Sequence, residues 1–103
     1  LNDMNNESDK LNVLRIINNK PKITQREMAK SLGLSLGKLH YVLQSLKNKG
    51  HIKIKNFRNN QNKINYLYLL TPSGISKKTK LTLNFMNLKM REYDELQKEL
   101  IKK

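Results

Sequence analysis

The side chains best suited to binding chemistry lie in one short polar and basic stretch of this chain. Glutamine can bond bidentately to the edge of adenine, and lysine can reach guanine O6 and N7 or a phosphate. Gln44 and Lys38 supply these two groups. Tyr41 could contact a thymine methyl group or a phosphate, or could instead pack against a wing, the β-hairpin expected after this stretch. The stretch therefore predicts hydrogen bonding to the base edges of a nucleic acid.

Helical periodicity indicates which of these side chains point outward. Apolar residues repeat at i, i+3, i+4 and i+7, the spacing that buries one face of a helix: Leu39, Val42, Leu43 and Leu46. The outward set is Gly37, Lys38, His40, Tyr41, Gln44 and Lys47. His40 is equally well explained as a solvated surface residue. A glycine at position 37 would let a nucleic-acid backbone approach closely.

A shorter helix is predicted directly before this one. Thr24 and Glu27 have the spacing of a capping box, in which each side chain satisfies a free backbone N–H. Gly33 lies where the helix must stop in a left-handed conformation, and Ser35 can cap the next helix. Ala29 is small enough for the two helices to cross closely. These spaced constraints together predict a helix-turn-helix.

In a helix-turn-helix the second helix, here 35–49, lies in the major groove of DNA. The N-termini of both helices bring hydroxyl, amide and guanidinium groups, with backbone N–H groups, to a place where phosphates bind well. The contacts expected there are Thr24, Gln25, Arg26 and Ser35.

The hydrophobic period changes from 3.6 to 2 after Gly50. Ile52 and Ile54 alternate with lysines, a polar turn spans 59–63, and Ile64–Leu70 is a second strand-like run. A hairpin that directly follows a helix-turn-helix is a wing. The wing segment, 56–64, is expected at the minor groove or the DNA backbone. Its expected contacts are Arg58, Asn59 and Lys63.

The wing strands also carry three aromatic residues, Phe57, Tyr66 and Tyr68. Aromatic side chains stack on bases in proteins that bind single strands. At strand spacing beside a hairpin, packing into a hydrophobic core is the favoured interpretation for all three.

A first helix is predicted over Lys10–Asn19, capped by Ser8 or Asp9, after a flexible N-terminus at 1–7. Three helices followed by a wing define a winged helix domain, here 8–71. The predicted fold class is therefore mainly α with a small β-hairpin (α+β), completed by a long C-terminal helix.

That C-terminal helix is predicted over 72–103, because Thr71 and Pro72 form a helix start and no later proline interrupts it. At about 1.5 Å per residue it would be roughly 45 Å long, longer than a domain of this size can cover. Its apolar stripe therefore predicts a dimer of two copies; packing wholly on its own domain is the alternative. The expected interface residues are Ile75, Thr79, Thr82, Met86, Met90, Tyr93, Leu96 and Leu100.

Charge is distributed very unevenly along the 103 residues. The formal net charge is +13, and no Asp or Glu occurs from Met28 to Arg91, where 13 of the 21 basic residues lie. A basic middle with mixed ends is typical of a polyanion binder. An AT-rich genome would also enrich lysine and asparagine and is the alternative explanation.

Composition also argues against several classes of protein. There is no cysteine, and neither histidine has an acidic neighbour in the basic middle, so no metal site, cofactor or catalytic centre is predicted and the chain is not expected to be an enzyme. No apolar run is long enough for a membrane span, and no signal peptide is recognisable. A cytoplasmic protein is expected. The first residue is Leu1, so the sequence leaves open whether this is the native start.

Three segments together resemble a known family: QREMAKSLGLSLGKLHYVLQSLKNKG, KNFRNNQNKINYLYLLTPSGI and NLKMREYDELQ. They resemble MarR-type winged helix regulators, and more narrowly the short MarR-like proteins associated with bacterial exopolysaccharide gene clusters. The narrower likeness rests on Ser35–Lys38, Asn56–Asn59 and Leu70–Ile75. The resemblance spans Leu11–Leu100 and implies a bacterial homodimer that binds duplex DNA and regulates transcription.

The resemblance departs from full-length MarR proteins in length, and no counterpart of their additional dimerisation helices or of much of their effector pocket is expected in the sequence given. A small-molecule effector is possible but is not supported by this sequence. The function predicted is sequence-specific binding of double-stranded DNA by a homodimeric transcriptional regulator. The alternative is a non-regulatory winged helix module that binds RNA, or binds DNA architecturally. Operator, target genes and the sign of regulation are not encoded in any recognisable pattern.

Overall fold

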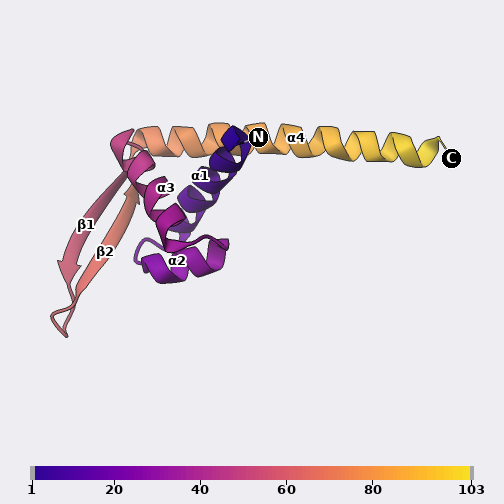
Figure 1. Cartoon of the computed structure of the whole chain (residues 1–103). Coiled ribbons are helices and arrows are strands. Elements are labelled where there is room, and N and C mark those ends of the chain that lie inside the picture. The colour runs from indigo at the N-terminus through magenta and orange to yellow at the C-terminus, as the bar shows by residue number, and fades with distance from the viewer. Residues whose placement is uncertain (1, 103) are drawn as a thin grey trace.

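The structure, a computed structural model, describes residues 2–102. Four helices and one hairpin follow each other along the chain (Figure 1). Their bounds are α1 (Asn2–Asn19), α2 (Gln25–Leu32), α3 (Leu36–Asn48), β1 (Ile52–Arg58), β2 (Ile64–Leu70) and α4 (Pro72–Ile101). This order confirms the predicted class, a mainly helical winged helix domain with a long C-terminal helix.

Helix α1 begins at Asn2, eight residues before the predicted start at Lys10. The segment expected as a flexible N-terminus is thus helical from residue 2, and Ser8 and Asp9 lie within the helix and do not cap it; residue 1 lies outside the described part. Adding a turn to an existing helix costs little, because one hydrogen bond forms for each residue that is fixed. Glu7 adds ion pairs with Lys10 and Lys77, at 3.5 and 3.4 Å.

The helix-turn-helix forms where its capping residues predict it. Thr24 Oγ1 accepts a hydrogen bond from the backbone N–H of Glu27 at 3.1 Å, and the Glu27 carboxylate accepts one from the Thr24 backbone. Gly33 ends α2 with φ +67°, in the left-handed region. Ser35 Oγ accepts from the backbone N–H of Lys38 at 3.1 Å and caps α3. These bonds fix where both helices begin.

One hydrophobic core joins the three helices, the base of the hairpin and the first part of α4. The buried residues are Leu11, Val13, Leu14, Ile17, Ile23, Met28, Ala29, Leu39, Val42, Leu43, Leu46, Ile52, Tyr68 and Leu81. The four apolar residues predicted to form the inner face of α3 are all among them. Their burial fixes the rotation of α3 about its own axis.

The hairpin is antiparallel, with Ile52 opposite Leu70 and Arg58 opposite Ile64. Of its three aromatic residues, Tyr68 is fully buried, whereas Phe57 and Tyr66 are 37% and 40% exposed. The prediction that all three pack into the core is therefore wrong for Phe57 and Tyr66. Both lie toward the tip of the hairpin, which extends beyond the helices that cover its base (Figure 1).

Helix α4 packs against α1 and β2 only along its first half. Thr71 caps it, and Gly74 approaches the backbone carbonyl of His51 so closely that a Cβ there would overlap this group. Leu81 is the last fully buried residue, and every residue from Lys89 to Lys102 is exposed. The C-terminal half projects from the domain (Figure 1), giving overall dimensions of 64 × 26 × 23 Å. Within residues 2–102, no helix combines the length and apolar character that crossing a membrane requires.

Candidate nucleic-acid interface

The outward face of α3 is centred on Gly37, Tyr41 and Gln44. At 100° per residue these positions lie opposite the buried leucines of the same helix. Tyr41 is 61% exposed and Gln44 is partly exposed, and a Cβ at position 37 would meet nothing within 4 Å. Tyr41 therefore does not pack into the core. The face can present the amide of Gln44, the phenol of Tyr41 and the backbone at Gly37, which another molecule can approach closely.

Two residues that the sequence analysis did not single out complete this face. Ser45 and Asn48 line a shallow hollow with Tyr41, Gln44 and Lys49. Asn48 follows Gln44 by four residues, one helical turn, so both amides lie on one line along α3. The same helical spacing that identified Gln44 could have identified Asn48. Asparagine, like glutamine, can bond bidentately to adenine.

His40 and Lys47 lie on one edge of α3 and are both exposed. The helix geometry places them side by side, seven residues apart, on the edge nearest the exposed Leu36. They agree with the predicted outward set. Because Lys47 lies near the C-terminal end of α3, its charge is placed to contact a phosphate. It is not placed to enter the major groove with the start of the helix.

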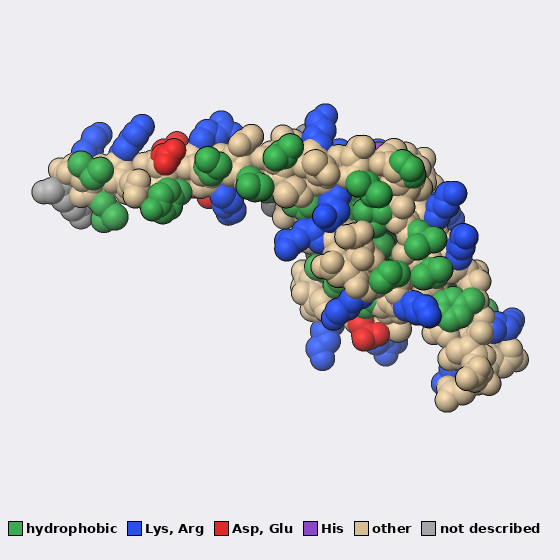
Figure 2. Space-filling model, turned by 180° about the vertical axis from the view of Figure 1, so that it is seen from behind, with side chains coloured by type: hydrophobic (Ala, Val, Ile, Leu, Met, Phe, Trp, Pro, Cys, Tyr) green, Lys and Arg blue, Asp and Glu red, His purple; other side chains and the backbone are tan. Residues whose placement is uncertain are grey.

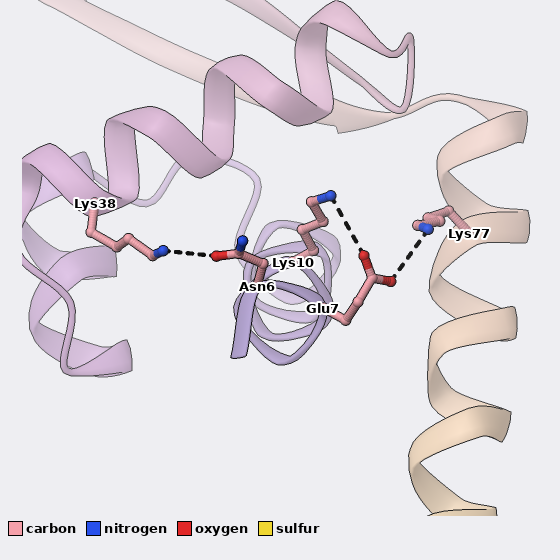
Figure 3. Close-up of polar contacts among 5 residues, drawn as sticks. All are labelled: Asn6, Glu7, Lys10, Lys38 and Lys77. Atoms are coloured by element: carbon pink, nitrogen blue, oxygen red, sulfur yellow. Dashed lines mark hydrogen bonds and ion pairs between the residues drawn. The ribbon is translucent and has the colours of Figure 1, made fainter. Parts of the chain in front are cut away.

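Lys38 lies on the opposite edge and turns toward α1 (Figure 3). Its Nζ donates to Asn6 Oδ1 at 2.8 Å and lies 4.0 Å from Asp9 Oδ2. It also lies 5.7 Å from the centre of the Tyr41 ring, within range of a cation–π contact. The structure thus does not present this amine outward, because α1 begins early enough to supply acceptors. A DNA contact by Lys38 would require it to leave these partners.

At the N-termini of α2 and α3, backbone N–H groups are more available to a ligand than the hydroxyls of the capping residues are. Thr24 Oγ1 donates to Glu27 Oε1 at 2.8 Å, and Ser35 Oγ serves as a cap, so both hydroxyls already have partners. Arg26 is exposed beside the first cap, where its guanidinium is free to reach a phosphate. Gln25 is only partly exposed. Phosphate binding here would depend on backbone N–H groups and on Arg26.

Gln25 lies beside the buried end of Tyr68. Within the described chain the Tyr68 hydroxyl has no hydrogen bond of ordinary geometry. Burial raises the pKa of Tyr68, and the neighbouring Gln25 side chain acts in the opposite direction. Because an unsatisfied buried hydroxyl is costly, a small rotation of Gln25 toward Tyr68 would be favourable. Gln25 is thus also placed to satisfy the Tyr68 hydroxyl.

The tip of the wing is a tight, polar turn. Asn59 Oδ1 accepts from the backbone N–H groups of Gln61 and Lys63, at 2.9 and 3.0 Å, and Asn62 has φ +60°. Arg58 Nη1 donates to the Asn62 carbonyl at 3.2 Å. Asn59 therefore holds the turn with its side chain, whereas Arg58 and Lys63 place their charges at the tip. Figure 1 shows this tip and α2 at the end of the domain away from α4.

The electrostatics of this end of the domain favour an anion. Glu27 is the acid within the helix-turn-helix, and the hydrogen bonds from Thr24 hold the pKa of its carboxyl below the usual value. Its charge is directed into the capping box. Across the rest of α2, α3 and the wing, all charged side chains are Lys or Arg. Among residues 2–102, no three His, Asp or Glu side chains gather where they could hold a metal ion.

The predicted dimer residues form a stripe along α4 that the domain leaves uncovered. Its large apolar members, Ile75, Met86, Met90, Tyr93, Leu96 and Leu100, are 54% to 76% exposed. Thr79 is also exposed and Thr82 is partly buried. Figure 2 shows apolar side chains continuing along the projecting part of the helix. The alternative, in which this stripe packs wholly on its own domain, does not agree with these exposures.

A groove runs between α1 and α4, and three of its wall residues, Thr82, Met86 and Met90, belong to this stripe. Its walls are Leu11, Arg15, Lys78, Thr82, Phe85, Met86, Lys89 and Met90. The floor is apolar, the rim carries three cations, and no acid takes part in its lining.

Comparison with known proteins agrees with this fold. A family model described as winged helix-turn-helix DNA-binding matches residues 10–53. The comparison with curated proteins finds no match. Among solved structures, the PcaV transcriptional regulator from Streptomyces coelicolor, in complex with its natural ligand, is similar with a TM-score of 0.67 and 19% identity, over 90% of this chain and 70% of that chain.

Two further structures show the range of this likeness. MarR from Staphylococcus aureus, in complex with salicylate and kanamycin, has a TM-score of 0.61 and 17% identity, over 84% of this chain and 56% of that one. A PadR-like transcriptional regulator from Bacillus cereus has a TM-score of 0.75 and 15% identity, over 85% and 90%. The winged helix fold implied by the resemblance is thus confirmed, and PcaV and the PadR-like protein are described as transcriptional regulators. The narrower likeness to exopolysaccharide-associated proteins stays a prediction.

Proposed function

We propose that this protein is a transcriptional regulator that binds double-stranded DNA sequence-specifically as a homodimer. The observation that carries the proposal is the outward face of α3, where two amides in line, Gln44 and Asn48, stand on a winged helix scaffold. Arg or Lys side chains alone would bind any phosphate backbone, whereas amides distinguish bases. The neighbouring regulators with the same fold support this assignment.

On DNA, α3 would lie in the major groove with Gln44 and Asn48 toward the base edges. Gly37 would allow the start of the helix to approach, and Tyr41 offers a ring for a thymine methyl group. His40 and Lys47, on one edge, would meet one strand's backbone. Thr24, Gln25, Arg26 and Ser35 belong to the helix N-termini that would meet the phosphates, with Lys38 added if it leaves α1.

The wing would extend the contact along the duplex. Arg58 and Lys63 carry the charges at its tip, and Asn59 keeps the turn in shape. An arginine at this place suits a narrow minor groove, which has a strongly negative potential. Phe57 and Tyr66, exposed on opposite faces of the hairpin, could add contacts with sugars or bases.

Homodimerisation would go through the exposed stripe of α4. An apolar stripe this long on a projecting helix gains stability when a second copy covers it. Two recognition helices related by a two-fold axis would read half-sites about one turn, some 34 Å, apart. We place the protein in the bacterial cytoplasm, with no cofactor, and propose no effector.

A non-regulatory module that binds RNA, or all duplexes alike, is the second candidate, favoured by the high positive charge. The two are separated by titrating the dimer with a random DNA duplex, an RNA duplex and single-stranded RNA at several salt concentrations. A regulator is expected to prefer B-form DNA and to lose affinity steeply as salt rises. Stronger binding to either RNA would favour the second candidate.

A further inference from the structure

Charge along α4 is divided into two halves. Residues 72–91 carry five basic side chains and no acid, whereas residues 92–99 carry four acids and one lysine. The apolar stripe, Ile75–Leu100, spans both halves. When a second copy covers the whole stripe, the acidic half of each helix must lie beside either the basic half or the acidic half of the other helix. This choice decides the orientation of the pair.

Antiparallel pairing brings unlike charges together. When the stripe overlaps fully, two antiparallel helices cross near Asn87 and Leu88, midway along it. The acidic segment 92–99 of each copy then lies beside residues 76–83 of the other, where Lys78 lies at the edge of the stripe and lines the α1–α4 groove. A parallel pair would place the acids beside acids and the lysines beside lysines. Like charges juxtaposed in an interface are strongly unfavourable.

The position of the acids around the helix supports the same pairing. Gly74 and Leu81, which face the domain, are followed on the same flank by Glu92 and Glu99, because steps of seven and eleven residues return to nearly the same side. In an antiparallel pair the two-fold axis is perpendicular to the plane that contains both helices. The flanks of the two copies therefore lie on the same side of the pair. Glu92 and Glu99 lie past the end of their own domain. In the antiparallel pair this part of the flank therefore meets the α1–α4 groove of the other copy.

The groove has the chemistry to receive this segment. Its apolar floor can contact Leu96 and Leu100, and its rim carries Arg15 and Lys78, which pair with no carboxylate among the described side chains. Glu92 is engaged by Lys89 of its own helix at 3.5 Å, but this pair is solvent-exposed and therefore weak. Exchange of partners on dimerisation costs little.

We infer that two copies of this chain pair antiparallel along α4, with the acidic segment 92–99 of each seated against the α1–α4 groove of the other. The inference rests on the homodimer of the proposed function and adds its orientation and a contact between the acidic segment and the cationic rim of the groove. It places both domains on one side of the helix pair, at opposite ends. Both recognition helices can then face the same duplex.

Cysteine crosslinking tests the orientation directly, since the chain has no cysteine of its own. Ile75→Cys and Leu100→Cys mark the two ends of the stripe. A short bis-maleimide is expected to link a mixture of the two variants into dimers and to link neither variant with itself. Arg91→Cys, on the opposite face of α4, mixed with Ile75→Cys is the matched control and is expected to give no dimer. Self-linked dimers of either variant, or no dimer in the mixture, would overturn the antiparallel pairing.

Charge reversal tests the contact between the acidic segment 92–99 and the α1–α4 groove. Two double variants are compared, Glu92→Lys/Glu99→Lys and Arg15→Glu/Lys78→Glu. When either variant dimerises with itself, like charges meet at both of the symmetry-related contacts between segment and groove. Each alone is expected to dissociate at least about tenfold more readily than the original chain, by sedimentation. Mixed together, each segment meets a groove of opposite charge, so dimers are expected to return. Full dimerisation of each variant alone, or no recovery on mixing, would refute the groove contact.

The failure of this inference can be distinguished from failure of the proposed function. A monomeric original chain that binds no DNA sequence preferentially would remove the proposed function itself. A dimer that selects a palindrome, yet links Ile75→Cys with itself, would retain the proposed function and remove only the antiparallel arrangement.

Discussion

Gln44 is the side chain on which base discrimination should depend most, because it is the amide at the centre of the outward face of α3. We expect Gln44→Ala to reduce the preference for one base pair by about 1–3 kcal/mol while binding to random DNA changes little. Competition between duplexes that differ at single positions would measure this. Equal losses on cognate and random DNA would contradict a base contact.

Lys63 should behave differently, because we propose that its charge at the wing tip meets the DNA backbone or the negative potential of the groove. Lys63→Ala is expected to weaken all duplexes alike and to reduce the slope of log affinity against log salt by about one. Lys102→Ala, remote from the interface, is a control of equal charge change. A sequence-dependent effect of Lys63→Ala would place this residue at a base edge.

His51 should make stability depend on pH. Burial, with Lys77, Lys49 and Lys10 nearby, lowers the pKa of His51 below its usual value. The unfolded chain then binds the proton more tightly, so this contribution to stability is complete above about pH 6.5 and is lost as the pH falls from there through the lowered pKa of the folded state. Denaturation between about pH 7.5 and 5.5 should show a smaller loss for His51→Gln than for the original chain.

Helical spacing was sufficient to predict most of the outward face of α3, because Gln44 and Tyr41 lie opposite a well-defined apolar face. It could not predict the partners of Lys38. They depend on where α1 begins, and the polar sequence before Lys10 carries no strong signal for a helix. The position of Gln25 near the Tyr68 hydroxyl likewise depends on the tertiary arrangement of α2 and β2.

At the scale of elements, the junction of α3, the hairpin and α4 depends on one close approach. Gly74 abuts the carbonyl of His51, which in turn accepts from the backbone N–H of Thr71 at 3.1 Å. We expect Gly74→Ala to lower the free energy of unfolding by about 1–3 kcal/mol, because backbone must move. Gly37→Ala, which meets open space, is the control and should leave stability equal or higher. Chemical denaturation of both variants measures the difference.

Capping residues made the bounds of α2, α3 and α4 predictable, since Thr24, Ser35 and Thr71 each satisfy a backbone N–H that a helix leaves free. Period-two alternation located β1, and the run INYLYLL, rich in β-forming residues, located β2. It could not determine which aromatic residues are buried. Strand alternation identifies a face, whereas the extent of cover depends on how far the hairpin reaches past the helices.

At the scale of the whole molecule, the projecting half of α4 should control assembly without supporting the fold. Tyr93→Glu/Leu96→Glu changes two exposed side chains beyond the domain. The variant is expected to be monomeric by sedimentation and to lose most of its affinity for a two-half-site duplex, while helix content and stability of the domain persist. Arg91→Glu, on the far face, is the control. A dimeric double variant would show that another surface holds the pair.

The central claim is sequence-specific recognition of DNA by a symmetric dimer. Selection from a randomised duplex DNA pool at about 150 mM salt, with single-stranded RNA as competitor, tests it most directly. We expect the selection to recover an inverted repeat whose half-sites lie about one helical turn apart. Recovery of no motif, with affinity determined by salt alone, would contradict it and favour a module that binds nucleic acid without sequence preference.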